Sequence, residues 1–301
     1  MEFVFDLIIF FYLFAVGAYL VHGVHRWNET QSHRWRLGIF WVLLLSWGGM
    51  FYGSFIEPRL IVVDSQQVIL DAQGTEHLQA VVVSDLHLGP FKKADWAARV
   101  VKQIQTLKPD VIFLLGDFVV SSPQDAKELK PLADLSAPYG VYAVTGNHEY
   151  RAKAAPEVIE GLAAAGIRVL QNENIKLEVN GKSVVLAGVS DIWFEGDLKK
   201  TLQDVPAEQD VILLAHNPDV VLSPASHLAD VILAGHTHGG QIRLPFLGPI
   251  AAEPTQLGRG YDKGWFTYEG VKLFITSGVG ESGTRARLFI PPEIVSLDIT
   301  F

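Results

Sequence analysis

The 301-residue sequence contains no cysteine. A disulfide scaffold is therefore excluded, and so is a zinc site built on thiolates, because both require cysteine sulfur. Whether the protein resides in an oxidising or a reducing compartment stays undetermined, since disulfides are the feature that would indicate it. The chain also lacks internal repeats, low-complexity tracts and a long linker. Its length suits one α/β domain of about 240 residues behind an N-terminal extension.

Positive charge is scarce: 24 Lys and Arg stand against 33 Asp and Glu, for a net charge of −9. Residues 1–56 carry three basic and three acidic groups, so the whole excess falls after residue 56. We therefore expect no nucleic-acid partner, because neutralisation of phosphates by Lys and Arg dominates that affinity. An anionic substrate remains reasonable, because bound divalent metals make a site locally positive.

Two N-terminal segments are almost free of charge. The run from Phe3 to Val21 is apolar except for Asp6, and Leu37 to Ile56 has no charged residue. About 20 apolar residues cross a bilayer as a helix, so these segments predict transmembrane helices at about 3–21 and 37–56. We therefore divide the chain into a membrane anchor, 1–56, and a domain, 57–301. A cleaved signal peptide is the alternative for the first segment, but it would need a basic n-region and a small-residue cleavage site.

Arginines beside these segments predict the orientation in the membrane. The connecting loop carries Arg26, Arg34 and Arg36, whereas the N-terminal flank carries no basic residue. The positive-inside rule places that loop in the cytoplasm, so the domain faces the periplasm or the cell exterior. The alternative is that the second segment only dips into the interface, which would leave the domain on the cytoplasmic face.

Five polar motifs in the domain each follow a short apolar run rich in β-branched residues. They are Asp85-Leu86-His87, Gly116-Asp117, Gly146-Asn147-His148-Glu149, Ala215-His216-Asn217 and Gly235-His236-Thr237-His238-Gly239-Gly240. Such runs predict buried strands, and open α/β sheets place their sites at the carboxyl ends of strands. Seven potential ligands arriving there suffice for two metal ions. Their oxygen and imidazole donors suit Mn, Fe, Co or Zn.

Spacing within the motifs predicts how the ligands are shared. Asp85 and His87 stand two residues apart, which in an extended stretch places both side chains on one face. His236 and His238 repeat this spacing. Asp117 follows a glycine that permits close backbone approach, so it is the candidate for a carboxylate that bridges the two ions.

Apolar periodicity predicts the elements around the site. Two strands, 81–83 and 111–115, flank an amphipathic helix over 91–107 and predict a βαβ unit. Asn180-Gly181 lies between two strand-like runs and predicts a tight hairpin. A further hairpin is predicted at 60–70. The pattern mixes parallel crossovers with antiparallel hairpins.

Together the five motifs resemble the calcineurin-like metallophosphoesterase superfamily, whose pattern is D-x-H, G-D, G-N-H-[DE], a lone H and G-H-x-H. The resemblance covers roughly residues 79–301. Segments 235–245 and 287–294 are similar to its bacterial membrane-associated branch, described as transmembrane or Tat-exported, with relatives linked to UDP-2,3-diacylglucosamine hydrolysis. The resemblance implies a four-layer α/β/β/α sandwich of two mixed sheets, here preceded by a two-helix membrane hairpin.

The resemblance also implies the ligand sets. The first ion is expected on Asp85, His87, Asp117 and His238. The second ion is expected on Asp117, Asn147, His216 and His236. A hydroxide bridging the ions would attack phosphorus, because a metal lowers the pKa of bound water to about 7.

Five further residues receive roles from their chemistry. His148 is expected to protonate the leaving oxygen, because its ordinary pKa of about 6.5 permits proton transfer near neutral pH. Glu149 is expected to orient an imidazole. Arg243 is expected to bind a phosphate oxygen, with Arg285 and Arg287 as weaker candidates.

We therefore expect a membrane-anchored phosphoesterase with two metal ions that hydrolyses a phosphodiester or pyrophosphate bond in a phosphorylated small molecule or a lipid-linked substrate. UDP-2,3-diacylglucosamine fits the resemblance, but that intermediate of lipid A biosynthesis is cytoplasmic and disagrees with an outward-facing domain. The alternatives are a non-catalytic scaffold on the same fold and a cell-wall-associated phosphodiesterase. Glu281, in a glycine-rich segment, would repel an anionic substrate if it faced the site.

Overall fold

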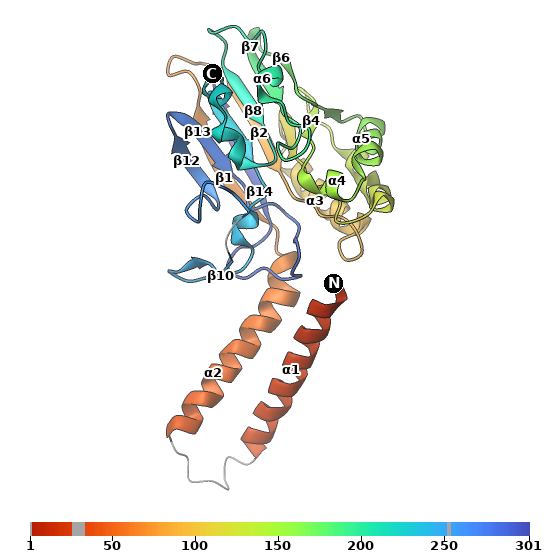
Figure 1. The fold of residues 1–301 in the computed structure, drawn as a ribbon, viewed down its shortest axis with the longest axis vertical. Coiled ribbons are helices and arrows are strands. Elements are labelled where there is room, and N and C mark those ends of the chain that lie inside the picture. Colours follow the sequence, from red (N-terminus) through yellow and green to blue (C-terminus); the bar gives the residue numbers. More distant parts are fainter. Residues whose placement is uncertain (1, 26–33, 252–253) are drawn as a thin grey trace.

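The computed structural model describes residues 2–25, 34–251 and 254–301, and it shows an α/β domain standing on two long N-terminal helices (Figure 1). Helix α1 spans Glu2–His25 and α2 spans Arg34–Phe51. Both are long and apolar enough to cross a membrane. They contact each other through a hydrogen bond of 2.8 Å from the indole of Trp47 to the carbonyl oxygen of Leu13. The predicted loop, with Arg26, lies largely outside the described residues.

Two six-stranded sheets form the centre of the domain. The first has the order β1-β14-β2-β3-β4-β5, with β1 Val62–Ile69, β14 Glu293–Thr300, β2 His77–Val83, β3 Val111–Leu115, β4 Val141–Val144 and β5 Arg168–Val169. The second has the order β12-β13-β9-β8-β7-β6, with β12 Gly264–Tyr268, β13 Val271–Ile275, β9 Val231–Ala234, β8 Val211–Leu214, β7 Lys182–Gly188 and β6 Glu173–Val179. A small separate hairpin pairs β10, Arg243–Leu244, with β11, Gly248–Pro249.

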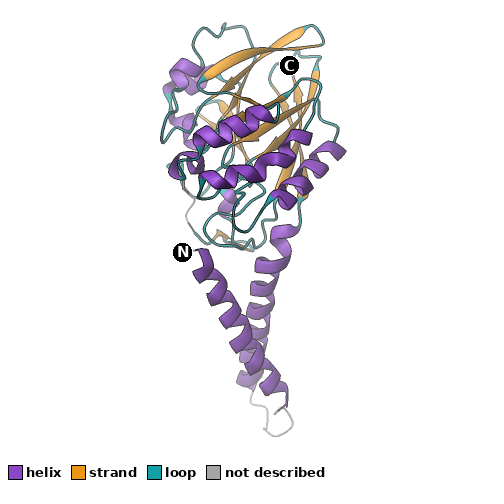
Figure 2. Cartoon of the chain, turned by 90° about the vertical axis from the view of Figure 1, so that its right-hand side faces the viewer, coloured by secondary structure: helices purple, strands orange, loops and turns teal. Residues whose placement is uncertain are grey.

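The two sheets pack face to face, and helices cover their outer faces (Figure 2). Alternation along β2 shows the reason: Val82 points into the core between the sheets, whereas Val81 and Val83 pack against the helical layer. That layer includes α3, Ala94–Thr106, and α5, Ala155–Ala164. A third apolar cluster, with Val220, covers the far side of the second sheet. The predicted sandwich of two mixed sheets is confirmed.

Local predictions had mixed outcomes. Strands β2 and β3 pair in parallel around α3, and β6 pairs with β7 across Asn180-Gly181, both as predicted. The hairpin predicted at 60–70 is wrong, because β1 runs without interruption and pairs in parallel with β14. The polar residues in its middle suggested a turn, but β1 is an edge strand in which Val68 is the one buried residue, so polar side chains are tolerated along it.

Candidate metal centre

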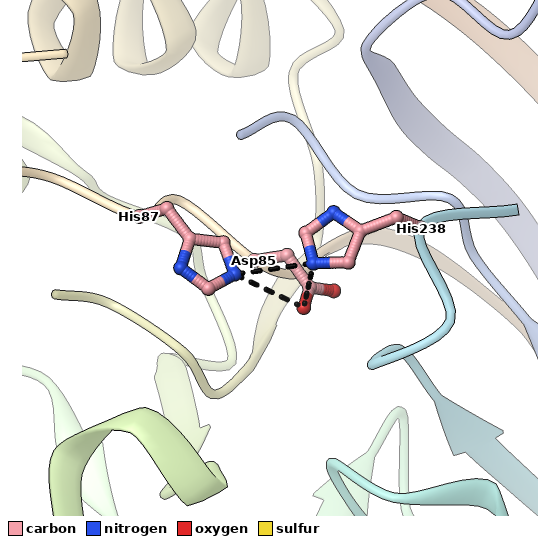
Figure 3. A group of neighbouring side chains, drawn as sticks. All are labelled: Asp85, His87 and His238. Atoms are coloured by element: carbon pink, nitrogen blue, oxygen red, sulfur yellow. Dashed lines mark hydrogen bonds and ion pairs between the residues drawn. The ribbon is translucent and has the colours of Figure 1, made fainter. Parts of the chain in front are cut away.

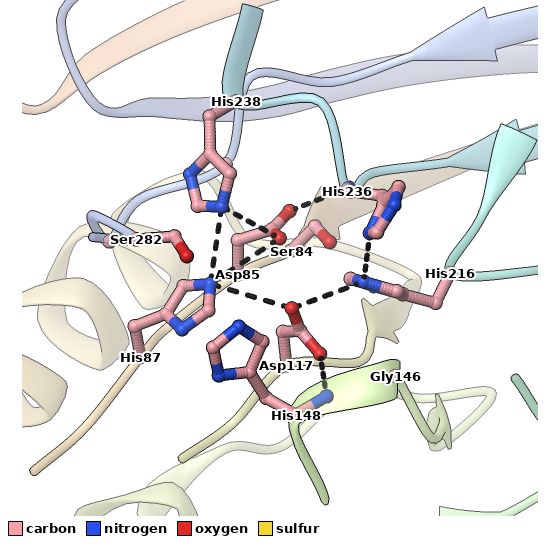
Figure 4. Close-up of polar contacts among 12 residues, drawn as sticks. Ser84, Asp85, His87, Asp117, Gly146, His148, His216, His236, His238 and Ser282 are labelled. Atoms are coloured by element: carbon pink, nitrogen blue, oxygen red, sulfur yellow. Dashed lines mark hydrogen bonds and ion pairs between the residues drawn. The ribbon is translucent and has the colours of Figure 1, made fainter. Parts of the chain in front are cut away.

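All five motifs directly follow strands of the two sheets. The strands are β2, β3 and β4 of the first sheet and β8 and β9 of the second, and neighbours within each set run in parallel. Their carboxyl ends therefore lie on one edge, where the motif side chains converge (Figure 4). The seven predicted ligands are buried, and none exposes more than 7% of its surface.

Asp85, His87 and His238 form the first group of ligands (Figure 3). The Nε2 atoms of the two histidines are 3.2 Å apart. Oδ1 of Asp85 lies 3.4 Å from Nε2 of His238 and 3.7 Å from Nε2 of His87. One carboxylate and two imidazoles therefore face a common point.

Asp117, His216 and His236 form the second group. Oδ2 of Asp117 lies 3.2 Å from Nε2 of His216 and 3.5 Å from Nε2 of His87. Nδ1 of His236 lies 3.1 Å from Nε2 of His216. The carboxylate of Asp117 therefore touches imidazoles of both groups, which is the position that a shared, bridging ligand requires.

Unpartnered atoms in the two groups fit divalent cations. Oδ1 of Asp85 is buried and accepts no hydrogen bond, although it faces two imidazoles. The Asn147 amide presents its oxygen 2.8 Å from Nδ1 of His236, so that an acceptor faces an acceptor unless the imidazole carries a proton there. Hydrogen bonding alone favours the opposite amide orientation, whereas a cation held by both residues requires the oxygen.

Five of the seven predicted ligands have a left-handed backbone. The φ angles are 57° for Asp85, 45° for His87, 53° for Asp117, 74° for His236 and 53° for His238. The extended stretch predicted for the Asp85–His87 pair is therefore wrong, and turns aim these side chains instead. Such conformations cost roughly 1–3 kcal/mol each and persist where the surroundings impose them, often at functional sites.

Glycines allow the motif loops to approach one another. A Cβ on Gly146 would overlap the Asp117 carboxylate, and one on Gly235 would overlap the hydroxyl of Ser84 and crowd the Asp85 carboxylate at 2.7 Å. Gly235 also precedes His236, whose backbone N–H donates to Oδ2 of Asp85 at 3.1 Å. The glycines of the motifs therefore hold the carboxylates and histidines at their close spacing.

The charges of the site suit a cation. Burial would raise the pKa of Asp85 and Asp117, but neighbouring histidines hold both well below their usual range. Burial lowers the pKa of His236 to about 4 and keeps His238 neutral as well. His216 differs: burial opposes its charge, yet Asp117 raises its pKa to about 10. Two carboxylates thus face neutral imidazoles, while His216 must lose a proton to ligate a metal.

His148 lies beside the ligands without belonging to the two groups just described. Its ring meets the ring of His87 edge to face at 4.6 Å, and its backbone N–H donates to Oδ1 of Asp117 at 2.8 Å. Its Nδ1 is 2.8 Å from the carbonyl oxygen of Val120, which can only accept, so this nitrogen carries the proton. Nε2 is then the free acceptor of a ring whose pKa is lowered by burial.

Glu149 has a different partner from the imidazole that we predicted. Its carboxylate accepts hydrogen bonds from the backbone N–H groups of Gly146, Asp117, Phe118 and Val119, at 2.7 to 3.3 Å. Burial raises its pKa to about 7. Glu149 therefore ties the Asp117 loop to the Asn147 loop through their backbones.

A cavity of about 380 Å³ opens in front of the ligands. It is lined by Asp117, Asn147, His148, Arg151, His236 and His238, among others. Arg151 is a residue that the sequence reasoning missed, and its guanidinium lies over the ring of Trp193 at 5.1 Å. The available signal was its place, three residues after His148, in the short helix α4, Asn147–Arg151, which the motif itself starts.

The other arginines lie elsewhere. Arg243 does not line this cavity; it pairs with Asp262 and donates to the carbonyl oxygen of Gly239 at 2.9 Å. Arg285 pairs with Asp6 of α1. Arg287 is fully buried and donates to backbone carbonyls, the shortest bonds being 2.7 Å to Ser277 and Gly280. Glu281 lies 2.8 Å from the ammonium of Lys92, which offsets its charge.

Known proteins are similar to this chain in sequence. The family model for calcineurin-like phosphoesterases matches residues 78–240. The protein F40B5.2 of Caenorhabditis elegans is 32% identical over 280 residues, 87% of this chain but only 57% of its own length. An uncharacterized metallophosphoesterase of Aquifex aeolicus is 33% identical over 258 residues, 82% of this chain and 94% of its own length. A transmembrane protein with metallophosphoesterase domain from Bos taurus is 34% identical over 182 residues, 55% of this chain and 41% of its own length.

Proposed function

Because this chain belongs to the calcineurin-like phosphoesterase family, we propose that it is a membrane-anchored hydrolase that uses two divalent ions to cleave a phosphodiester or pyrophosphate bond. The observation that carries the proposal is the pair of buried ligand groups joined by Asp117. One ion would be held by Asp85, His87, Asp117 and His238, and the other by Asp117, Asn147, His216 and His236. Bound divalent ions would activate water and draw charge from the phosphoryl oxygens.

The residues around the ligands then position the substrate. Arg151 lines the cavity, and its guanidinium can form a bidentate pair with two phosphate oxygens. A ring nitrogen of His148 lies within 4.8 Å of a carboxylate oxygen of Asp117, and because Nδ1 is taken by the carbonyl oxygen of Val120, Nε2 is the nitrogen that exchanges a proton with the leaving oxygen. Because its imidazole is neutral at rest, this nitrogen must first take up a proton before it can donate one.

The membrane anchor supports a substrate held at a membrane. Two apolar N-terminal helices and a relative named as a transmembrane protein support the anchor. The arginines of the connecting loop support an outward-facing domain. UDP-2,3-diacylglucosamine is proposed on the motif resemblance alone, and it requires the opposite orientation.

The test is hydrolysis by the full chain in detergent, stripped of metal and reloaded with Mn, Fe, Co or Zn. The substrates are bis-p-nitrophenyl phosphate and UDP-2,3-diacylglucosamine. Metal-dependent turnover that is lost in Asp117→Asn and kept in His227→Ala supports the proposal; His227 is a matched control because it is half-exposed and pairs with Glu269 away from the site. Metal binding without turnover of either substrate would favour a scaffold.

The leaving group isolates the role of His148. p-Nitrophenolate is a stable anion that leaves without a proton, whereas an alkoxide needs one. His148→Ala should therefore lose more activity on an alkyl phosphodiester than on the p-nitrophenyl diester. Equal losses on both would mean that the His148 imidazole does not protonate the leaving oxygen, because the backbone N–H that donates to Asp117 is kept in this variant.

A further inference from the structure

Large apolar side chains stand exposed on the β10–β11 hairpin and the neighbouring segment. We call Leu244, Phe246, Leu247, Ile250 and Phe289 the apolar tip. Phe246 is fully exposed, Leu247 is 79% exposed and Phe289 is 57% exposed. Contiguous apolar surface of this kind marks an interaction site, whereas scattered single residues do not.

The backbone holds both phenylalanines outward at a conformational cost. Phe246 has φ 66° and Phe289 has φ 57°, a region that bulky side chains rarely adopt. The two segments are joined, because the backbone N–H of Arg243 donates to the carbonyl oxygen of Leu288 at 2.9 Å. Phe246, Leu247 and Phe289 also line one shallow cavity. The surrounding structure therefore imposes this exposure.

The apolar tip lies next to the point where the chain leaves the predicted membrane helix. Glu57 follows the π-helix Tyr52–Ile56 that continues α2, and its carboxylate accepts a hydrogen bond from the backbone N–H of Phe289 at 2.9 Å. The backbone N–H of Arg287 donates to the carbonyl oxygen of Gly53 at 2.9 Å. In Figure 1, β10 lies at the end of the domain that faces the two helices. A bilayer around α1 and α2 would therefore meet this face of the domain first.

The charge of the tip fits a phospholipid surface. Residues 242–250 contain no acidic residue, although the whole chain has a net charge of −9. Arg243 and Arg259 flank the tip. Arg243 is paired with Asp262, which lines the same shallow cavity, whereas Arg259 forms no ion pair with the described residues and donates to the carbonyl oxygens of Pro249 and Ile250 at 3.2 and 3.1 Å. Apolar side chains beside arginines are the composition of interfacial membrane contacts.

The tip also reaches the metal cavity. Ile250 is 56% exposed, and it lines the cavity together with Ile242 and Ala251. Resting on the proposed function, we propose that the apolar tip inserts into the interfacial layer of the bilayer that holds α1 and α2, and that it guides a phosphoester carried on a lipid into the metal cavity. The tip is thus a second membrane contact, separate from the helices.

The absence of cysteine permits a direct test of insertion. Phe246→Cys in the full chain gives a single thiol for an environment-sensitive dye, and Leu228→Cys gives a matched control. Leu228 is apolar and 56% exposed, but it precedes β9, at the sheet edge opposite the site. In vesicles of phosphatidylcholine and phosphatidylglycerol, nitroxide-labelled lipid should quench the dye at position 246 and not at 228. Equal quenching at both positions, or energy transfer between labelled chains in detergent, would overturn the proposal.

A second experiment separates the tip from the hydrolytic reaction. In the double variant Phe246→Asp, Leu247→Asp, hydrolysis of a phosphatidyl p-nitrophenyl diester in vesicles should fall by about tenfold or more, because apolar insertion is lost. Hydrolysis of soluble bis-p-nitrophenyl phosphate should stay at the wild-type rate. If the double variant hydrolysed both substrates at the wild-type rate, insertion of the apolar tip would be refuted. A wild-type chain inactive on both would refute the proposed function, while the quenching experiment would still decide on the tip.

Discussion

Two regions of this molecule bury charged side chains, and they treat them in opposite ways. At the junction between the membrane helices and the domain, Glu57 accepts two backbone N–H groups and Arg287 donates to backbone carbonyls. At the candidate metal centre, Oδ1 of Asp85 is buried without a hydrogen-bond partner and faces Nε2 of His87 and of His238, which lie 3.2 Å from each other.

The difference separates architecture from function. A buried charge with a full set of partners stabilises one arrangement of the chain, and its removal leaves those partners unsatisfied. Buried lone pairs that face one another without protons instead need a ligand from outside. The left-handed backbone at five of the ligands points the same way, because strain is retained where function requires it.

The largest expected effect contrasts one carboxylate from each region. Asp117→Asn should lower kcat/KM on bis-p-nitrophenyl phosphate by more than about 100-fold and should lower the metal content. Mutating a residue that only hydrogen-bonds to a metal ligand usually costs about 10–100-fold, so a larger loss is expected for a ligand itself. Glu57→Gln, equally buried, should keep the metal content. Steady-state kinetics and elemental analysis of both variants decide the matter. If Glu57→Gln folded but no longer bound metal, the distinction between a structural carboxylate at the junction and a metal-binding carboxylate at the site would be contradicted.

The next effect falls on stability. Arg287→Met should lower the free energy of unfolding by about 3–5 kcal/mol, because several buried carbonyls lose their donor. Arg168→Met is the control, since its exposed pair with Glu173, at 3.3 Å, contributes about 0–1 kcal/mol. Denaturant unfolding in detergent measures both. Equal free energies of unfolding for the two variants would mean that the buried hydrogen bonds of Arg287 do not stabilise the junction.

A pH dependence should report Lys92, whose ammonium donates to the carbonyl oxygen of Pro58 at the junction, at 3.2 Å. Burial lowers the pKa of Lys92 to about 8, partly opposed by Glu281, whereas an unfolded lysine titrates near about 10.4. Between these values the unfolded chain binds more protons, so stability should rise with pH, by at most about 3 kcal/mol. The unfolding free energy of the wild type should therefore rise relative to that of Lys92→Met across this window. A constant difference would mean that Lys92 stays charged in the fold.

The smallest expected effect concerns the carboxylate that joins the two motif loops. Glu149→Gln replaces an acceptor of backbone N–H groups by a donor, which displaces the Asp117 loop. We expect a loss of about 10–100-fold in metal affinity or activity, with the fold retained. Metal titration of the variant measures it. Wild-type metal affinity would show that the left-handed turns hold the ligands without this carboxylate.

Much of the fold was predictable because its signals are local. Apolar runs ending in polar motifs gave the five strands that carry the site, and Asn180-Gly181 gave a hairpin. The hairpin predicted at 60–70 failed for a non-local reason: the segment finds its partner in β14, more than two hundred residues away. The residues of one strand do not indicate which distant strand it will pair with.

The sequence by itself determined which side chains gather at the centre, because each motif sits at the end of a strand and parallel strands end on one edge. Only the tertiary structure decided what surrounds them. It placed Arg151 in the cavity and paired Arg243 with Asp262, and it gave Glu149 backbone partners in place of an imidazole. It also brought Phe289 to Glu57, 232 positions away, and so set the apolar tip beside the membrane helices. Such contacts depend on how segments that are distant in the sequence pack together, and they cannot be predicted from the residues of one short segment.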